Sequence, residues 1–252
     1  MRRAGRLLAA TLAAVAKKAT AGTSLVELER EAEKLIRKGG GKPAFKGYKG
    51  YPYATCLSVN EEVVHGLPRQ YRLSEGDLVG IDIGVVFDGW YVDSAFTVGV
   101  GKISAANERL LSVTKKALWA GIKQVKPGRR LGDIQAAIQQ AVERAGFTVI
   151  KDLCGHGIGR SLQEDPQIPN FGKKGTGPSL AVGDTFSLEP MVTFSSAHTA
   201  TKPDGWTVMT LDGKNAAHFE HTVAVTKDGV EVLTLRKGER EDRRLDATNR
   251  FV

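Results

Sequence analysis

Five side chains in this sequence have the types and settings of metal ligands. They are four carboxylates and one imidazole: Asp82, Asp93, His156, Glu189 and Glu220. Each carboxylate stands in a stretch rich in β-branched and aromatic residues, where burying its charge is costly unless a cation compensates it. Mixed oxygen and nitrogen ligands suit Mn, Fe, Co or Zn better than calcium. The pattern therefore predicts a pair of divalent cations about 3.5 to 4 Å apart.

The two aspartates are predicted to share one face of a β-hairpin. The stretch reads GIDIGVVFDGWYVDSAF, and its dipeptide Asp88-Gly89 suits a type I′ turn. A two-residue turn there sets Asp93 opposite Gly84, with Asp82 diagonal to it on the same face. A hairpin with that face in solvent would explain the two aspartates equally well, and these residues alone leave that alternative open.

The two glutamates and the histidine lie in similar surroundings. Glu189 in DTFSLEPMV and Glu220 in HFEHTVAV fall on strand faces opposite apolar neighbours. His156 stands between two glycines in CGHGIGR, which would let the backbone bend close to the ions.

Helices are predicted ahead of these strands, in two similar pairs. The segment from Gly22, GTSLVELEREAEKLI, resembles the segment from Gly128, GRRLGDIQAAIQQAV, at an offset of 106 residues. Both keep the helical spacing of apolar positions, and Ser24 with Glu27 forms a capping-box signal. Each segment follows another apolar helical stretch. Chance similarity between amphipathic helices is the alternative to a true repeat.

The composition indicates a soluble globular protein. A chain of 252 residues with 41% hydrophobic and 25% charged residues has room for one large domain or two halves, and disorder is excluded for most of it. Cys56 and Cys154 are too few for a disulfide framework and fit a reducing compartment. The net charge of +8 favours anionic surroundings such as RNA.

The N-terminal stretch has two interpretations. It reads MRRAGRLLAATLAAVAKK, and its basic start and apolar run from Leu7 to Ala16 resemble a signal peptide. The internal repeat instead makes this run the first helix of the domain. No run reaches the roughly 20 apolar residues that a membrane span requires.

Nearly the whole chain resembles the type I, bacterial-type methionine aminopeptidases. The resemblance rests on the order and spacing of YPYATCLSVNEEVVHGLP, IDIGVVFDGWYVDSA, CGHGIGR, FSLEPM, DGWTV and FEHTVAVT. It implies an α+β protein with the pita-bread (creatinase/aminopeptidase) fold, in which two pseudo-symmetric halves form a curved antiparallel sheet covered by helices. We expect one catalytic domain over residues 1–238 and a charged tail over residues 239–252.

The resemblance implies a cytoplasmic metallo-exopeptidase that removes the initiator methionine from nascent proteins with a small second residue. The ligands of the family fall on the same five residues. Asp93 and Glu220 bridge two ions and Asp82 chelates one of them. His156 and Glu189 hold the other ion. A metal-bound hydroxide then attacks the carbonyl after the methionine, with Glu189 as the general base.

Substrate-binding residues also follow from the resemblance. His65 corresponds to a histidine beside the scissile bond, and the methionine pocket is lined by aromatic and polarisable side chains, Tyr48, Tyr51, Cys56 and Trp206. The chain departs from the family at Gln163 and Leu162, which replace a histidine and an aromatic residue, and at Gly84 and Phe45. A glutamine donates a hydrogen bond but transfers no proton, so we expect activity to survive with an altered hold on the substrate backbone at Gln163.

Two alternatives remain beside this function. A proline-specific aminopeptidase shares the fold, although such relatives usually carry a further N-terminal domain. A metal-free relative that binds RNA or the ribosome gains a little support from the basic loop from Arg37 to Lys49, and the five retained ligands count heavily against it. The expected partners are nascent polypeptide N-termini and the ribosome, without a membrane, and the expected state is a monomer.

Overall fold

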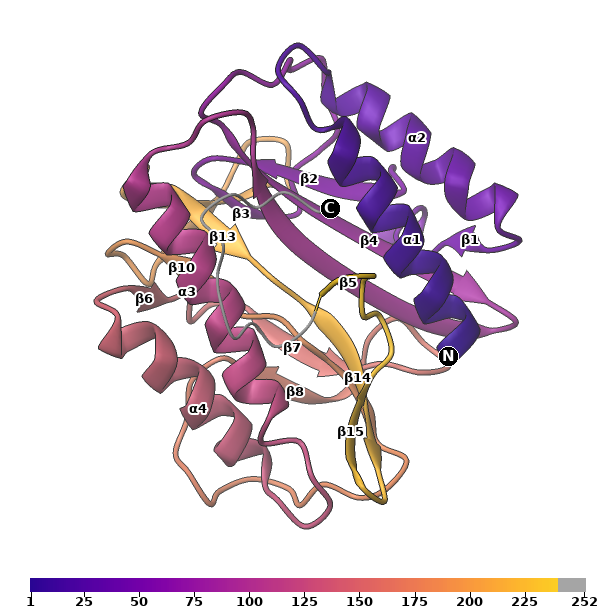
Figure 1. The fold of residues 1–252 in the computed structure, drawn as a ribbon, viewed down its shortest axis with the longest axis vertical. Helices are drawn as coiled ribbons and strands as arrows, with labels where there is room; N and C mark the ends of the chain where they lie inside the picture. Colours follow the sequence, from indigo (N-terminus) through magenta and orange to yellow (C-terminus); the bar gives the residue numbers. More distant parts are fainter. Residues whose placement is uncertain (240–252) are drawn as a thin grey trace.

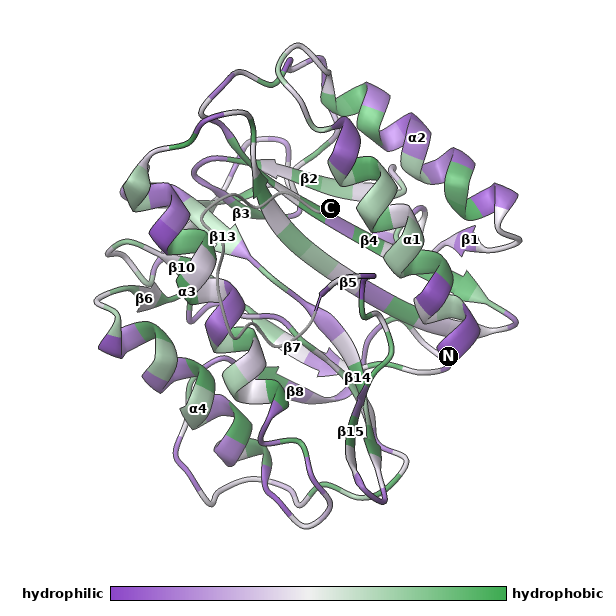
Figure 2. Cartoon of the chain, in the orientation of Figure 1, coloured by the Kyte–Doolittle hydropathy of each residue, from purple (hydrophilic) through white to green (hydrophobic). Residues whose placement is uncertain are grey.

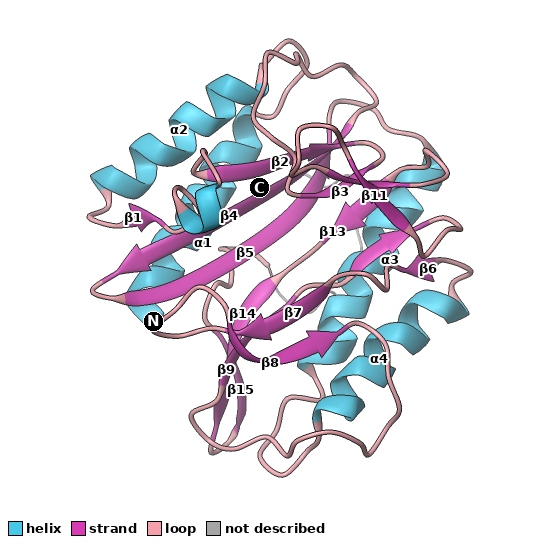
Figure 3. Cartoon of the chain, turned by 180° about the vertical axis from the view of Figure 1, so that it is seen from behind, coloured by secondary structure: helices cyan, strands magenta, loops and turns pink. Residues whose placement is uncertain are grey.

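The protein is an α+β structure in which helices cover one side of several antiparallel sheets (Figure 1). The computed structural model describes residues 1–239. Its helices are α1 (Arg2–Lys18), α2 (Leu25–Lys38), the short 3-10 helix η1 (Tyr48–Gly50), α3 (Ala105–Ile122) and α4 (Leu131–Arg144). From behind, the strands lie in front of the helices (Figure 3).

Most strands belong to two sheets, one in each half of the chain. The first sheet contains β1 (Lys42–Pro43), β2 (Thr55–Val59), β4 (Leu78–Phe87) and β5 (Trp90–Gly99). The second has the order β15-β14-β9-β7-β8, with bounds β7 (Cys154–Gly157), β8 (Glu164–Pro169), β9 (Thr185–Leu188), β14 (His221–Thr226) and β15 (Gly229–Val232). The two halves meet at β5, where the Glu220 amide donates to the Ala95 carbonyl at 2.8 Å.

Two three-stranded sheets complete the strands of residues 1–239. One has the order β13-β10-β6, with bounds β6 (Thr148–Val149), β10 (Met191–Thr193) and β13 (Ala216–His218). The other has the order β11-β12-β3, with bounds β3 (Glu62–Val64), β11 (Thr199–Thr201) and β12 (Val208–Thr210). In the second of these sheets, β3 of the first half pairs with β12 of the second half.

The predicted helix pairs are present. Helices α2 and α4 begin at Leu25 and Leu131, 106 residues apart, and each follows a longer helix. The predicted capping box also forms, because Ser24 Oγ accepts from the Glu27 amide at 3.2 Å and Glu27 Oε2 accepts from the Ser24 amide at 2.7 Å. All four long helices carry both apolar and polar residues (Figure 2), and most of their buried apolar side chains belong to one core cluster. Helices α1 and α2 pack on strands of the first half, whereas α3 and α4 pack mainly on strands of the second half.

The run from Leu7 to Ala16 lies within α1 and packs against β4 and β5. Leu8, Leu12 and Val15 are fully buried, at spacings of three and four residues that place them on one helix face. The prediction of a structural helix is therefore confirmed. No helix in the described part of the chain is long and apolar enough to cross a membrane.

The described part of the chain ends in the predicted tail. Glu239, the first residue of that tail, is buried and accepts a hydrogen bond from Arg236 Nη2 at 2.5 Å. Residues 240–252, which make up the rest of the tail, lie outside the described residues.

Candidate metal centre and substrate pocket

The β4–β5 hairpin has the predicted register. Phe87 pairs with Trp90 and Gly84 with Asp93. Asp88 and Gly89 have φ values of 51° and 73°, as a type I′ turn requires. Asp93 is only 3% exposed, so this face of the hairpin lies inside the protein and the solvent-facing alternative is excluded.

The two glutamates lie where the chain passes from one sheet to another. Strand β9 ends just before Glu189 and β10 begins two residues later, while β13 and β14 flank Phe219 and Glu220 in the same way. The sequence predicted strands running through both positions, and the structure interrupts them. Pro190 has no amide hydrogen for a ladder, and the Glu220 amide bonds to β5 instead. Both carboxylates line one cavity.

His156 presents its Nε2 atom to the carboxylates. Its Nδ1 lies 2.9 Å from the Gly157 carbonyl and donates to it, so Nε2 is the atom that would bind a metal after losing its proton. Nε2 lies 3.4 Å from Asp93 Oδ2 and 3.6 Å from Glu189 Oε1. Ligand atoms of Asp93, His156 and Glu220 all lie within 4.8 Å of one another.

The glycines beside His156 serve close packing. A Cβ atom at Gly155 would lie 2.3 Å from the Ser187 carbonyl oxygen, and one at Gly157 would lie 2.2 Å from that of Asp165. Neither glycine has a positive φ. The expected bending of the backbone is therefore not what these glycines provide; they let β7 approach its neighbours closely.

Burial and mutual repulsion hold protons on Asp82, Glu189 and Glu220 when no metal is bound. Burial is the larger cause, and the negative charge of Asp93 the next, of the pKa values of Asp82 and Glu220 being raised well above their usual range. Burial raises the pKa of Glu189 to about 8. Burial opposes the charged form of His156, but Asp93 outweighs this and raises its pKa to about 10.

This cluster fits divalent cations. One imidazolium could not balance the four carboxylates once they ionise in a buried site, and Asp82 Oδ1 is buried without a hydrogen-bond partner. Metal ions would both balance the negative charge and give Asp82 Oδ1 a partner. Metal binding would then release protons from the cluster.

Hydroxyl groups hold the ligand residues Asp93 and Glu220 in place, and these hydroxyls were not among the predicted site residues. Thr222 Oγ1 donates to the Asp93 carbonyl at 2.7 Å, and Ser187 Oγ donates to Glu220 Oε1. Ser94 Oγ donates to the Glu220 carbonyl at 2.6 Å. The signal was available in part, because Ser187 and Thr222 alternate onto the predicted faces of the glutamates.

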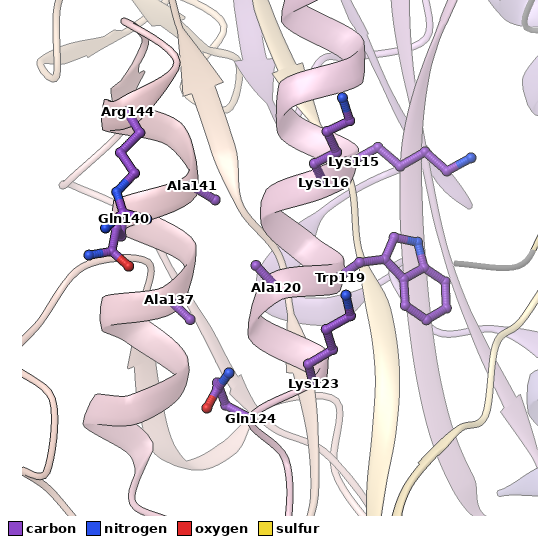
Figure 4. A pocket seen from close by; sticks show the side chains of 10 residues that line it. All are labelled: Lys115, Lys116, Trp119, Ala120, Lys123, Gln124, Ala137, Gln140, Ala141 and Arg144. Carbon is purple, nitrogen blue, oxygen red and sulfur yellow. The ribbon is translucent and has the colours of Figure 1, made fainter. Parts of the chain in front are cut away.

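One cavity of about 290 Å³ brings all the predicted site residues together. Its lining contains every one of the eleven: Tyr48, Tyr51, Cys56, His65, Asp82, Asp93, His156, Gln163, Glu189, Trp206 and Glu220. A larger hollow of about 410 Å³ over α3 and α4 is lined by lysines, an arginine, glutamines, alanines and a tryptophan (Figure 4). It contains no carboxylate or imidazole, so the chemistry lies in the smaller cavity.

Aromatic residues form one wall of the cavity. The rings of Tyr51 and Trp206 pack edge to face, with their centroids 5.1 Å apart. Tyr51 Oη donates to the Thr55 carbonyl at 2.8 Å. The Asp204 carboxylate accepts from the Trp206 amide at 2.8 Å and fixes that loop. Burial raises the pKa of the Cys56 thiol, so this wall is uncharged.

Two histidines lie near the carboxylates in addition to His156. His65 lines the cavity with a left-handed backbone, at φ 58°, and burial lowers its pKa. His218, which the sequence analysis did not assign to the site, has Nε2 3.9 Å from Glu189 Oε2. Burial, and then the neighbouring His65, lower the pKa of His218 to about 3, so its imidazole is neutral.

Three positions at which the sequence was expected to depart from the family lie close together. The Phe45 ring lies over Gly84, where a Cβ atom would come within 2.5 Å of Phe45 Cε1. Phe45 also packs in the same apolar cluster as Leu162. The lack of a side chain at Gly84 therefore makes room for the phenyl ring.

Comparisons with known proteins agree with this geometry. Residues 1–227 match Metallopeptidase family M24. The methionine aminopeptidase of Clostridium perfringens is 47% identical over 94% of this chain and 95% of its own length, and methionine aminopeptidase 1 of Bacillus subtilis is 47% identical over 93% and 94%. Among solved structures, the methionine aminopeptidase of Thermotoga maritima superposes with a TM-score of 0.92 at 48% identity, covering 93% of this chain and 94% of its own.

More distant structures share the fold alone. The prolidase of Pyrococcus horikoshii superposes with a TM-score of 0.76 at 21% identity, covering 95% of this chain and 61% of its own. Fold and site together define a metal-dependent peptidase of family M24 with the predicted pita-bread architecture. Within that class the chain belongs to the methionine aminopeptidases of the bacterial type, as its motifs predicted.

Proposed function

We propose that this enzyme removes the N-terminal methionine from newly made proteins whose second residue is small. The observation that carries the proposal is the cavity itself, in which an apolar aromatic wall adjoins a buried cluster of carboxylates. The aromatic wall offers a thioether the contacts it favours. The carboxylates offer ligands for metal ions beside the bond to be cut.

We further propose two divalent ions, from among Co, Mn, Fe and Zn, held by the five predicted ligands. Asp93 and Glu220 would bridge them, with Asp82 on one ion and His156 and Glu189 on the other. Such ions, when bound, lower the pKa of water and polarise a carbonyl. Four carboxylates carry four negative charges, and two divalent cations would balance them, which supports this number.

The remaining roles fall to side chains of the cavity. Glu189 accepts a proton as general base, and this role is supported by burial, which raises its pKa to about 8 when no metal is bound. His65 contacts the substrate beside the scissile bond. Tyr48, Tyr51, Cys56 and Trp206 line the pocket for the methionine side chain, and Gln163 borders the exit of the peptide.

Peptide hydrolysis tests this proposal against both alternatives. We expect Met-Ala-Ser to be cleaved after methionine when Mn, Co, Fe or Zn is added separately to the metal-free protein, and chelation to stop the reaction. Faster cleavage of peptides with a proline in second position would favour the proline-specific alternative. A protein that binds none of these metals would favour the RNA-binding alternative.

Restoring the family residue at Gln163 should improve the hold on the substrate backbone. We expect Gln163→His to raise kcat/KM on Met-Ala-Ser by up to about tenfold, the equivalent of one hydrogen bond of about 1.4 kcal/mol in the transition state. Steady-state kinetics would measure it. An unaltered kcat/KM would show that Gln163 does not limit the reaction.

We also infer that the enzyme works in the cytoplasm as a monomer, close to ribosomes. The net charge of +8 supports attraction to ribosomal RNA, which weakens as salt rises. Cosedimentation with ribosomes at low salt tests this association.

A further inference from the structure

Three side chains meet at the mouth of the substrate cavity. Tyr48 Oη donates to Gln163 Oε1 at 3.0 Å, and Lys49 Nζ donates to the same oxygen at 3.2 Å. All three line the cavity, and we call them the clasp. Tyr48 and Lys49 belong to η1 in the first half of the chain, whereas Gln163 precedes β8 in the second half. The clasp therefore joins the two halves across the opening.

The clasp determines which way the Gln163 amide points. A lysine ammonium has donors and no acceptor, so the atom that contacts Lys49 must be the amide oxygen. Two donors occupy that oxygen. The amide nitrogen, with its two hydrogens, is therefore the group of Gln163 that remains for a substrate.

The backbone at Lys49 is unusual for a residue with a Cβ atom. Its φ of 49° lies in the left-handed region, which favours glycine. The turn that holds it is closed by the Gly47 amide, which donates to the Tyr51 carbonyl at 2.7 Å. Residues held in such conformations cluster at ligand-binding sites, where the strain fixes the position of a side chain.

The charge of Lys49 has no carboxylate partner within residues 1–239, where it contacts only Gln163 and the Tyr48 ring. Lys46, three residues earlier in the same loop, is paired with Glu33 at 3.0 Å. Lys49 and Gln163 are both exposed, whereas Asp93 and Glu220 are buried. An uncompensated cation thus lies on the rim, where the peptide must leave the cavity.

We propose that Lys49 and Gln163 form a subsite for the part of the peptide that follows the scissile bond. The Gln163 amide nitrogen donates to a backbone carbonyl of the substrate, and Lys49 binds a carboxylate. That carboxylate is either the C-terminus of a short peptide or an Asp or Glu side chain close behind the methionine. This subsite rests on the proposed function and specifies which substrates it favours.

The first test compares peptides that differ only in charge at the C-terminus. With the metal-loaded enzyme, we expect kcat/KM for Met-Ala-Ser to exceed that for its C-terminal amide by about two- to fivefold, the range of an exposed ion pair. Raising the ionic strength should reduce this ratio, because salt screens exposed charges.

A second pair of peptides separates the two sources of the carboxylate. The amides of Met-Ala-Asp and Met-Ala-Asn differ only in a side-chain charge. A preference confined to the first pair assigns the subsite to a terminal carboxylate, and one confined to the second pair assigns it to a side chain. Equal rates within both pairs would overturn the proposal.

Variants of the loop show whether Lys49 is responsible. In Lys49→Met, the ratio of kcat/KM between the charged and the uncharged peptide of the preferred pair should fall to about one. Lys49→Arg should keep the wild-type ratio. Lys46→Met is the matched control, because it removes a lysine of the same loop that faces Glu33 and should leave the ratio unchanged. A preference that survives in Lys49→Met would also overturn the proposal. No cleavage of any methionine peptide by the wild type would instead overturn the proposed function.

Discussion

An Asp93→Asn protein is expected to lose more than about 100-fold in metal affinity and in kcat/KM on Met-Ala-Ser, while keeping its fold. Mutating a residue that only orients a metal ligand lowers metal affinity or activity by about 10- to 100-fold. Because Asp93 is proposed to bridge both ions, its loss should lower them further. Asparagine keeps the shape of the side chain and removes the charge. Metal titration followed by calorimetry, together with steady-state kinetics, would measure both effects.

The same substitution should also change how the stability of the metal-free protein depends on pH. The charge of Asp93 contributes to the raised pKa values of Asp82, Glu189 and Glu220, so removing it should lower them. Folded Glu189 binds its proton more tightly than a carboxyl with the ordinary pKa of 4.5, and this group therefore makes folding less favourable as pH rises from 4.5 to about 8. That dependence should weaken in Asp93→Asn.

Thermal unfolding with and without metal tests the assignment of Asp93 as a ligand. We expect a much smaller rise in Tm on adding metal than in the wild type. Asp88→Asn is the matched control, because Asp88 lies in the same hairpin, is exposed, and forms only a surface pair with Arg3 at 3.0 Å. A wild-type metal response in Asp93→Asn would contradict its assignment as a ligand.

The sequence predicts the hairpin well because its determinants are local. A turn dipeptide and a period of two residues are enough to place Asp82 and Asp93 on one face, and the structure has that register. Helical periodicity and a capping box likewise identify α2. Assembly of the other ligands around the same cavity depended on the resemblance of motifs, since no local pattern relates His156 to a strand more than 60 residues away.

Features set by distant contacts were outside the reach of sequence patterns. The strand breaks at Glu189 and Glu220 depend on a bond from Glu220 to Ala95 and on which sheet each segment joins. The clasp joins Tyr48 to Gln163, residues 115 positions apart. Composition marked the end of the chain as a charged tail, yet Glu239 is buried, because its partners Arg236 and His221 are buried as well.

Glu239→Ala is expected to lower the free energy of unfolding by about 3 to 5 kcal/mol, the cost of leaving a buried charge unpaired. Arg236 is 2% exposed, lies over the Phe96 ring at 4.2 Å, and pairs with Glu239 Oε1 at 2.5 Å. Without Glu239, the guanidinium of Arg236 would remain buried beside Ser94 with no carboxylate to balance its charge. Urea unfolding of the metal-free protein would measure the change.

Two further variants test whether burial of the pair explains this cost. Glu231→Ala removes an exposed pair with Arg2 and should cost less than about 1 kcal/mol. Replacing the buried pair by Arg236→Met with Glu239→Leu should recover most of the stability, because no unpaired charge remains. A loss in the double variant as large as in Glu239→Ala would show that the charges themselves, and not their mutual compensation, are needed.

The dependence on pH gives an independent check. Burial favours the protonated form of Glu239, but His221 and Arg236 outweigh it and hold its pKa at about 2, below the ordinary value of 4.5. The stability that this carboxylate contributes is therefore fully present above pH 4.5 and is lost as pH falls towards 2. In urea unfolding at a series of pH values, Glu239→Ala should differ most from the wild type above pH 4.5, and the two should converge as the solution is acidified. A difference that does not change over this range would mean that the side chain stabilises the fold by packing and not by its charge.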